Sequence, residues 1–325
     1  MSFGFWGKAA VRSWRCGLLF CSFLVVSCGQ GNGGPAASVP EELSPLEAAR
    51  NLAVINSRQD APLADTSAYP EEIQAILNRG SVIFAMTAAD QKPFFYREET
   101  TGELAGLDVE LAYEIANRLG VRAVFNRDAV SFDEVVRQVL DRKADIALSK
   151  LSRTLPRAEL VRYTTPYIVF RQALLVNRLE FAKIGTEDQL PSYIKNFTGR
   201  LGVIKNSSYA NYAAANFPSA IIESFDTWDE TVDALFAGKV LAVYRDEGEI
   251  LIVNATRKDA AILMKTVFIN DQQDPIAMAV APDAPLLQEW LNVFLEEYLR
   301  QKNGEFAIAR IVQRHFSAAK SAANP

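Results

Sequence analysis

Histidine and cysteine are almost absent from this chain of 325 residues. It has one histidine, His315, and its three cysteines (Cys16, Cys21 and Cys28) all lie within the first 28 residues. A single histidine argues against a histidine-built metal site and a histidine-based catalytic triad. Cysteines confined to one end of the chain cannot form a disulfide framework. We therefore expect no metal site, and no motif indicates another cofactor.

An excess of basic charge is also lacking. The formal net charge is −5, and residues 1–27 contain three basic and no acidic residues, so the rest of the chain is more acidic still. Nucleic-acid phosphates require a basic face, so we expect no nucleic-acid partner. The absence of a phosphate-binding loop indicates that the chain does not itself hydrolyse ATP. Its 49% hydrophobic and 22% charged residues are typical of a protein that forms a core.

Long apolar runs are missing too, and the longest one lies near the N-terminus. Three basic residues precede the apolar stretch Cys16–Val26, whose about 11 residues are too short to cross a bilayer as a helix. The stretch ends in Val25-Val26-Ser27-Cys28-Gly29, which resembles a bacterial lipobox. We expect residues 1–27 to be a lipoprotein signal peptide and Cys28 to carry a lipid anchor. The alternative is a plain signal peptide with a chance cysteine.

Residues 28–69 are predicted to form a lipidated tether and linker. Gly29–Val39 has the glycine-rich composition of a flexible chain. Ser44-Pro45-Leu46-Glu47 is a capping box with proline at the first helical position, so a short helix to about Asn56 is expected. The mature protein is thus expected in the periplasm or on the cell surface, held to a membrane by lipid.

From residue 70 the chain alternates between helix and strand signals. Such alternation favours mostly parallel, doubly wound sheets, and two successive series predict two lobes. The predicted strands are Ser81–Met86, Val121–Asn126, Asp145–Leu151, Arg171–Asn177, Arg200–Ile204, Ala220–Phe225, Val240–Tyr244 and Ile276–Ala281, with a hairpin at Phe94–Arg97. The predicted helices are Pro70–Arg79, Leu107–Leu119, Pro285–Gln301, Glu305–Phe316, one after each of the capping residues Ser131 and Thr227, and one from Ser208.

Several segments together resemble the family 3 extracellular solute-binding proteins, the polar amino acid receptors of ABC importers. They are, in order, Gly102–Gly120 (GELAGLDVELAYEIANRLG), Phe132–Tyr167, Gly202–Ala213, Asp226–Glu247 and Asp274–Leu299. The resemblance extends in order and spacing over most of the chain after residue 70.

This resemblance implies an α/β fold, the type II clamshell of periplasmic binding proteins. Two doubly wound lobes would be joined by two crossing strands, near Tyr167–Arg171 and Asp271–Ile276. Lobe 1 would comprise residues 70–169 and 273–325, and lobe 2 residues 170–272. The last segment would return to complete the first lobe.

The resemblance also implies which residues hold an amino acid. Within S/T-x-T-x-x-R, the stretch Ser152–Arg157 places Arg157 where the family binds the solute carboxylate, with Ser152 as the polar residue before it. An arginine fork donates two parallel hydrogen bonds to a carboxylate. Asp246 matches the family's ligand for the ammonium group. Taken without the family, Arg157 is a solvated arginine in a first helical turn and Asp246 a turn former.

Three further residues match positions that line the family's cleft. Phe132 would pack an aromatic wall against the solute, and its alternative is a hydrophobic contact at a helix start. Lys205 and the backbone around Ser207–Tyr209 match a loop that closes on the solute from the second lobe. By itself the sequence NSSY is an ordinary helix cap.

Departures from the family bear on which solute is bound. Lys150 stands where glycine is usual, Arg245 precedes the binding aspartate, and Ala88 occupies a position that often contacts the ligand's side chain. Lys150 and Arg245, together with Lys205, bring positive charge to an acidic protein. We therefore expect a preference for an acidic or amide amino acid (Glu, Asp or Gln) over a cationic one. The alternative is that these cations form salt bridges between the lobes.

The expected function is capture of a polar amino acid by hinge closure and its delivery to an ABC permease with its ATPase. The receptor is expected to be a monomer and not an enzyme. Two alternatives remain open. One is an amino acid-sensing module that reports to a partner protein. The other is a cyclohexadienyl dehydratase-like enzyme, for which Glu247 or Asp90 would be the candidate general acid.

Overall fold

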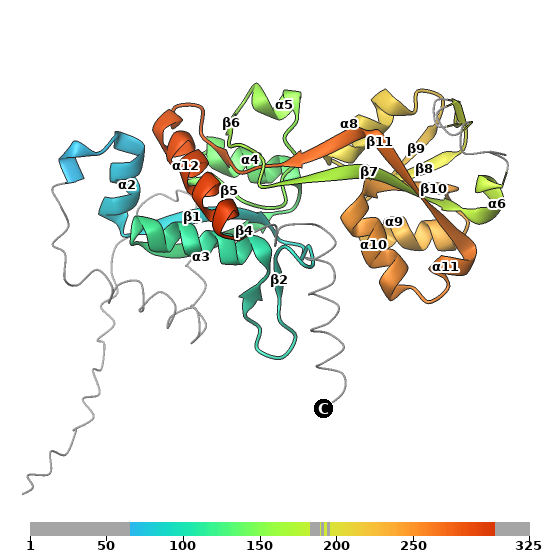
Figure 1. Ribbon diagram of the computed structural model, residues 1–325, viewed down its shortest axis with the longest axis horizontal. Helices are drawn as coiled ribbons and strands as arrows, with labels where there is room; N and C mark the ends of the chain where they lie inside the picture. Colours follow the sequence, from blue (N-terminus) through green and yellow to red (C-terminus); the bar gives the residue numbers. More distant parts are fainter. Residues whose placement is uncertain (1–65, 183–188, 190–191, 194–195, 303–325) are drawn as a thin grey trace, which may run out of the picture. The chain divides into compact units, whose positions relative to one another are not determined.

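The computed structural model in Figure 1 describes residues 66–302 except 183–188, 190–191 and 194–195. The predicted signal peptide, Cys28, residues 28–65 of the predicted tether and linker and the predicted helix Glu305–Phe316 lie outside the described residues. The helices are η1 Thr66–Ala68, α2 Glu71–Arg79, α3 Leu107–Leu119, α4 Phe132–Leu140, α5 Leu155–Ala158, α6 Arg178–Phe181, α8 Ser208–Asn216, α9 Trp228–Phe236, α10 Glu247–Thr256, α11 Ala260–Leu263 and α12 Pro285–Gln301. The strands are β1 Ser81–Thr87, β2 Tyr96–Arg97, β3 Leu104–Ala105, β4 Arg122–Ala129, β5 Ile146–Ala147, β6 Arg162–Tyr163, β7 Ile168–Asn177, β8 Arg200–Ile204, β9 Ile221–Phe225, β10 Ala242–Asp246, β11 Met264–Ile276 and β12 Ala279–Val280.

The first lobe is built on a sheet with the strand order β4-β1-β5-β12-β6. Strand β1 pairs in parallel with β4 and β5, whereas β12 pairs antiparallel with β5 and β6. Helices α2, α3, α4 and α12 contribute buried apolar residues to its core, including Ile76, Leu111, Val135 and Leu291. Strand β12 and helix α12, which come from the end of the described chain, thus belong to this lobe.

The second lobe is built on a sheet with the order β11-β7-β10-β8-β9. Side chains that alternate along a strand point to opposite faces of its sheet. Accordingly, Leu174 and Val176 of β7 pack with Tyr209 of α8 on one face. Ala173 and Leu175 pack with α9 and α10 on the other. Both faces of this sheet are therefore covered, as expected for a doubly wound lobe.

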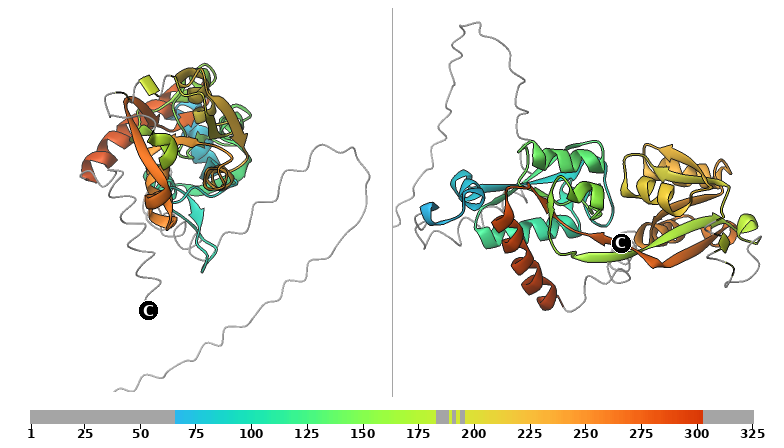
Figure 2. Two further views of the ribbon diagram at one scale, coloured as in Figure 1. Left: turned by 90° about the vertical axis from the view of Figure 1, so that its right-hand side faces the viewer. Right: turned by 90° about the horizontal axis from the view of Figure 1, so that it is seen from above.

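Strands β7 and β11 link the two lobes. They pair antiparallel from Met264 opposite Asn177 to Ile276 opposite Ile168, with a register shift between Ile269 and Gln273. Their ends nearest Ile168 and Ile276 belong to the core of the first lobe, and the rest of both strands lines the cores of the second. The two neighbouring strands can be followed in Figure 1 and Figure 2. The predicted pair of crossing strands is confirmed.

Two features of the fold differ from the sequence prediction. Each sheet is mixed rather than mostly parallel, because the crossing strands and β12 run antiparallel to their neighbours. The predicted strand Asp145–Leu151 is reduced to β5, and Lys150, which takes a positive φ of 47°, lies outside it. Within the described part of the chain, no helix is long and apolar enough to cross a bilayer.

Candidate ligand-binding site

A small buried cavity lies where the two lobes meet β11, and we call it the inner cavity. Its volume is about 10 Å³, which is room for about one water molecule. Six of the nine predicted ligand-binding residues line it. The complete lining is Phe132, Lys150, Ser152, Ser208, Tyr209, Arg245, Asp246, Asp274 and Ile276.

Asp246 enters the cavity at the junction between β10 and α10. It is the last residue of β10 and also the N-cap of α10, where its Oδ1 accepts a hydrogen bond from the Glu249 backbone N–H at 3.1 Å. Burial by itself raises the pKa of Asp246, but the positive charges of Lys150 and Arg245 outweigh this effect, so the pKa lies below its ordinary value. Asp246 is therefore a buried carboxylate whose charge is already balanced by the protein.

Lys150 provides the closest counter-charge. Its Nζ lies 2.9 Å from Asp246 Oδ2 and 2.6 Å from Glu249 Oε1. The same ammonium lies 5.0 Å from the ring centre of Phe94 and 5.1 Å from that of Phe170, at the range of cation–π contacts. Lys150 follows the first sheet and Asp246 ends a strand of the second, so this ion pair joins the lobes. The sequence-based alternative that a cation bridges the lobes is thus realised at Lys150.

The second cation, Arg245, is stacked among aromatic rings. Its guanidinium lies 5.6 Å from the ring centres of Phe132 and Tyr209 and 5.9 Å from that of Trp228. Its Nε is 3.5 Å from Asp246 Oδ2, a distance at which charges attract but hydrogen bonding is weak. The Arg245 side chain is only 4% exposed. A buried guanidinium with so few polar contacts is suited to an anionic solute.

Hydroxyl groups complete the cavity wall. Ser208 Oγ donates to Ser152 Oγ at 2.8 Å, and Ser152 Oγ donates to Asp274 Oδ2 at 3.1 Å. Burial, together with the negative charge of Asp246, raises the pKa of Asp274 to about 6, although the hydrogen bond from the Ser152 hydroxyl acts in the opposite direction.

Unsatisfied polar atoms gather at this cavity. Within the described residues, four buried side-chain polar atoms make no hydrogen bond of normal geometry. Three of them, Arg245 Nε, Tyr209 Oη and Asp274 Oδ1, belong to residues of the inner cavity. Buried polar groups are normally hydrogen-bonded, and exceptions concentrate at functional sites. Two donors and one carboxyl oxygen therefore remain for a polar solute.

Arg157 lies next to the inner cavity but does not line it. Its Nε and Nη2 donate to Asp133 Oδ1 at 3.0 and 2.8 Å, and its Nη1 donates to the Ser152 carbonyl at 3.2 Å. The Arg157 side chain is 7% exposed, but that of Asp133 is 56% exposed. A solvated carboxylate is a weak partner, so a solute carboxylate is able to replace it on this guanidinium.

Lys205 lines a larger opening, which we call the outer cavity, of about 580 Å³. Lys205 pairs with Asp226 on its rim. The outer cavity also contains Phe132 and Glu249 and lies at the carboxyl ends of β1 and β8, where α/β sheets commonly bind ligands. Ala88 is exposed and lines neither cavity, although its neighbours Thr87 and Ala89 line the outer one.

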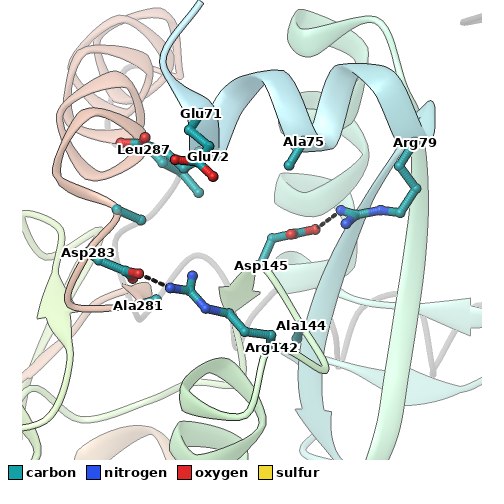
Figure 3. Close-up of a pocket in the computed structure, with 11 residues that line it drawn as sticks. Glu71, Glu72, Ala75, Arg79, Arg142, Ala144, Asp145, Ala281, Asp283 and Leu287 are labelled. Atoms are coloured by element: carbon teal, nitrogen blue, oxygen red, sulfur yellow. Dashed lines mark hydrogen bonds and ion pairs between the residues drawn. The ribbon is translucent and has the colours of Figure 1, made fainter.

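A third cavity, of about 410 Å³, lies against α2 and the start of α12 (Figure 3). Both of its arginines are ion-paired, Arg79 with Asp145 and Arg142 with Asp283. No predicted ligand-binding residue lines it. No group of three or more possible metal ligands occurs at this or any other place in the described parts of the chain.

Sequence reasoning missed several residues of the site. Asp274 lines the inner cavity, and Glu249 and the rings of Phe94 and Phe170 surround the Lys150 ammonium. Ser208 also lines the inner cavity, but only the backbone around it had been predicted to contact the solute. The sequence contained one usable signal: Asp274 is an acidic residue within the segment Asp271–Ile276, which was predicted to cross between the lobes. The other contacts join distant segments and leave no local pattern.

A buried carboxyl beneath the site predicts a pH dependence. Asp108 accepts the Lys150 backbone N–H at 2.7 Å and the Tyr167 hydroxyl at 2.9 Å. Burial outweighs these contacts and raises the pKa of Asp108 to about 7. The pKa of Asp108 is higher in the folded protein than in the unfolded one. The contribution of protonated Asp108 to the stability of the fold is therefore present at low pH and is lost as pH rises through 7.

We therefore expect the melting temperature of the protein to fall between pH 5 and 8. Loss of stability from Asp108 is on the order of a few kcal/mol. Asp108→Asn should flatten most of this slope in a thermal-unfolding series. A residual slope of the same sign is expected from Asp274, and an unchanged slope in Asp108→Asn would contradict the assignment.

Two α/β lobes joined by two crossing strands around a polar cavity define a type II periplasmic-binding-protein clamshell. The family model of the bacterial extracellular solute-binding proteins, family 3, matches residues 83–318. The chain belongs to this family, and the resemblance seen in the sequence is confirmed.

Individual relatives are more distant. An arginine-binding periplasmic protein of Mannheimia haemolytica is 23% identical over 218 residues, which cover 66% of this chain and 84% of that protein. A cyclohexadienyl dehydratase of Pseudomonas aeruginosa is 32% identical over 127 residues, covering 39% of this chain and 46% of the enzyme. The structure of an amino acid ABC transporter substrate-binding protein of Streptococcus pneumoniae bound to L-arginine has a TM-score of 0.61 and 22% identity, covering 76% of this chain and 98% of that one. That likeness shows the shared fold.

Proposed function

We propose that this chain is an extracytoplasmic receptor that encloses a small carboxylate-bearing solute of the amino acid class and delivers it to an ABC permease. One observation carries the proposal: buried, unpartnered polar atoms from the second lobe and from a crossing strand converge on one cavity that residues of both lobes line. The names of the relatives, an arginine-binding periplasmic protein and an ABC transporter substrate-binding protein, support the same class of function.

Closure around the solute is the proposed mechanism. The inner cavity is too small for an amino acid, so the solute has to enter while the lobes are apart, with β7 and β11 as the hinge. Arg157 would exchange Asp133 for the solute carboxylate, and Arg245 would approach the same solute from the second lobe. A solute shifts the equilibrium toward the closed form only by its difference in affinity for the two forms. Contacts from both lobes supply that difference.

We further propose that, among amino acids, this receptor prefers acidic or amide side chains to cationic ones. Two cations, Lys150 and Arg245, face the inner cavity. The carboxylates Asp246 and Glu249 already share the Lys150 ammonium. A cationic side chain would thus meet two like charges, which is costly in a closed site, and would find only Asp274 Oδ1 free among the carboxyl oxygens of the inner cavity. The relatives that bind arginine or histidine do not decide this point, because their identity to this chain is low.

Lipid attachment at Cys28, tethering by residues 28–69 and a monomeric state belong to the same proposal. The division into lobe 1 (residues 70–169 and 273–325) and lobe 2 (residues 170–272) is also part of it. Anchoring would keep the receptor next to the permease. A sensing role would use the same site and closure but a different protein partner.

The test is a thermal-shift screen of the purified, unlipidated chain against the twenty amino acids, followed by calorimetry. A solute that binds only the folded state raises the melting temperature with the logarithm of its saturation. We expect L-glutamate, L-aspartate or L-glutamine to produce larger shifts than L-lysine and L-arginine. Tighter binding of L-lysine or L-arginine would contradict the proposed preference. No shift with any of the amino acids or with the matching dicarboxylates glutarate and succinate would contradict the receptor function.

One observation favours an enzyme as the second candidate. Asp274, with its raised pKa of about 6 and a free Oδ1, has the properties of a general acid, and a dehydratase is among the relatives. The acids nominated from the sequence are less suitable, because Glu247 is paired with Arg171 and Asp90 with Arg127. Incubation of the same preparation with prephenate separates the candidates: turnover that disappears in Asp274→Asn would establish the enzyme.

A further inference from the structure

The Lys150 ammonium is enclosed by groups of the kind that bind a free ammonium ion. Two carboxylates and two aromatic rings surround it: Asp246, Glu249, Phe94 and Phe170. We call these four residues the ammonium cage. The Lys150 side chain is 2% exposed, as is that of Asp246. The cage is therefore buried and completely filled by the protein's own lysine.

The backbone around the cage is adapted to this arrangement. Lys150 has a positive φ, a conformation that favours glycine over residues with a side chain. The Asp108 carboxylate accepts a hydrogen bond from the Lys150 backbone N–H at 2.7 Å. On the other side, a Cβ on Gly248 would lie 2.9 Å from the Phe170 ring, so the absent side chain lets α10 approach that ring closely. A lysine retained in a strained conformation indicates that its side chain has a role at this position.

The charges near the cage are balanced without a solute ammonium. Lys150 and Arg245 provide two positive charges, and Asp246 and Glu249 two negative ones. Unpartnered donors remain at Arg245 Nε and Tyr209 Oη. Donors without partners are suited to a carboxylate, whereas an additional ammonium would find Asp246 and Glu249 occupied by Lys150 and only Asp274 Oδ1 free.

We propose that Lys150 is a specificity-determining residue that takes the place of a solute ammonium, so that the closed cleft prefers carboxylates without an α-ammonium group to the amino acids of the same skeleton. This inference rests on the proposed receptor function and narrows its substrate class. The lysine is tethered, so it competes with any free ammonium at a high effective concentration. Preference for acidic over cationic amino acids is unaffected, because both carry the same α-ammonium.

The first test compares matched solutes by calorimetry at pH 6. Glutarate and L-glutamate share a skeleton and differ at the α-ammonium, as do succinate and L-aspartate. We expect the wild-type protein to bind the plain dicarboxylate at least about tenfold more tightly than its amino acid. This comparison needs no variant, so it does not depend on how a substitution affects folding.

The second test removes the tethered ammonium. Lys150→Gly fits the positive φ and opens the cage, so its affinity for L-glutamate should rise and its affinity for glutarate should fall, each about tenfold or more. The falling affinity follows because Asp246 and Glu249 then face an anion without their cation. Lys239→Gly is the matched control, because Lys239 is an exposed lysine of the second lobe, and its variant should keep the wild-type order.

Chemical rescue tests the cage independently of any solute. n-Butylammonium resembles the missing side chain and should raise the melting temperature of Lys150→Gly with increasing concentration. It should have no such effect on the wild type, on Lys239→Gly or on Lys150→Met, in which an uncharged chain fills the same space. If Lys150→Gly does not fold alone, the amine is added during refolding, and recovery of folded protein is the measurement.

The outcomes separate this inference from the proposed function. Wild-type protein that binds L-glutamate at least as tightly as glutarate would overturn the inference and leave the receptor function standing. Failure of n-butylammonium to stabilise Lys150→Gly would overturn it as well. Rescue by the amine without binding of any of the four solutes would support the cage and contradict the receptor function.

Discussion

Asp246→Ala is expected to destabilise the folded protein by about 4 kcal/mol, which lowers the melting temperature by roughly 12 °C for a chain of this size. Two losses add up. The α10 helix loses its N-cap acceptor for the Glu249 N–H, and Lys150 loses one of its two buried carboxylate partners. Asp246→Asn should restore the cap but not the charge, so its loss should be about 3 kcal/mol.

Urea unfolding followed by circular dichroism measures both variants against a control. Asp259 also occupies an N-cap, that of α11, but it is exposed and makes no side-chain capping bond. Asp259→Ala should therefore differ from the wild type by less than about 0.5 kcal/mol. If Asp246→Ala were as stable as this control, Asp246 would not anchor the buried ion pair.

Arg245→Met is expected to have the opposite profile, with binding lost and stability kept. The guanidinium has an unpartnered Nε, a 3.5 Å ion contact to Asp246 and a 3.3 Å hydrogen bond to Gln91. The Asp246 carboxylate keeps Lys150 at 2.9 Å as its main counter-charge, so removing the weaker 3.5 Å contact of Arg245 should destabilise the fold much less than removing Asp246. Removing a charge-assisted contact to a solute costs about 3 kcal/mol, or roughly 100-fold in affinity.

The solute affinity of Arg245→Met is measured by titration with glutarate and L-glutamate. Its stability is measured by the melting temperature of the solute-free protein. Arg200→Met is the control, because it removes the same charge from a side chain that is 61% exposed. It should leave affinity and stability near the wild type. A variant at Arg245 that binds the tighter solute normally would exclude this guanidinium from the site.

Asp246 and Arg245 are adjacent in sequence and line the same cavity, but we expect the first to matter mainly for stability and the second mainly for solute binding. Asp246 accepts hydrogen bonds from Glu249 and Lys150, so removing its carboxylate destabilises the fold. Arg245 is held mainly by aromatic stacking, and its polar atoms remain for a solute. Polar groups left without partners inside a protein cost stability, and they are retained where function needs them.

Local patterns predicted much of the fold well. Helices Leu107–Leu119 and Pro285–Gln301 and strand Arg200–Ile204 have the predicted bounds. The capping residues Ser131 and Thr227 accept the expected backbone N–H at 3.2 Å. These features depend on neighbours three or four residues away.

Features that depend on distant partners were predicted less well. Helix α10 was missed because it starts directly at the end of β10, where Asp246 both ends the strand and caps the helix. Strand β11 was predicted only near its crossing segment, because most of its residues alternate between the two faces of a sheet whose other strands come from elsewhere. The mixed strand directions of both sheets were missed for the same reason, because they depend on pairing between strands that are distant in sequence.

The amino-acid sequence by itself determined the class of fold, the crossing strands and most of the residues that meet at the cavity. It determined them through periodicity, capping and segments whose order matches a family. Only the tertiary structure decided how the charges pair: Arg157 with Asp133, and Lys150 with Asp246 and Glu249. Charge pairing depends on distances between side chains that are far apart in sequence, and these distances exist only once both lobes have folded.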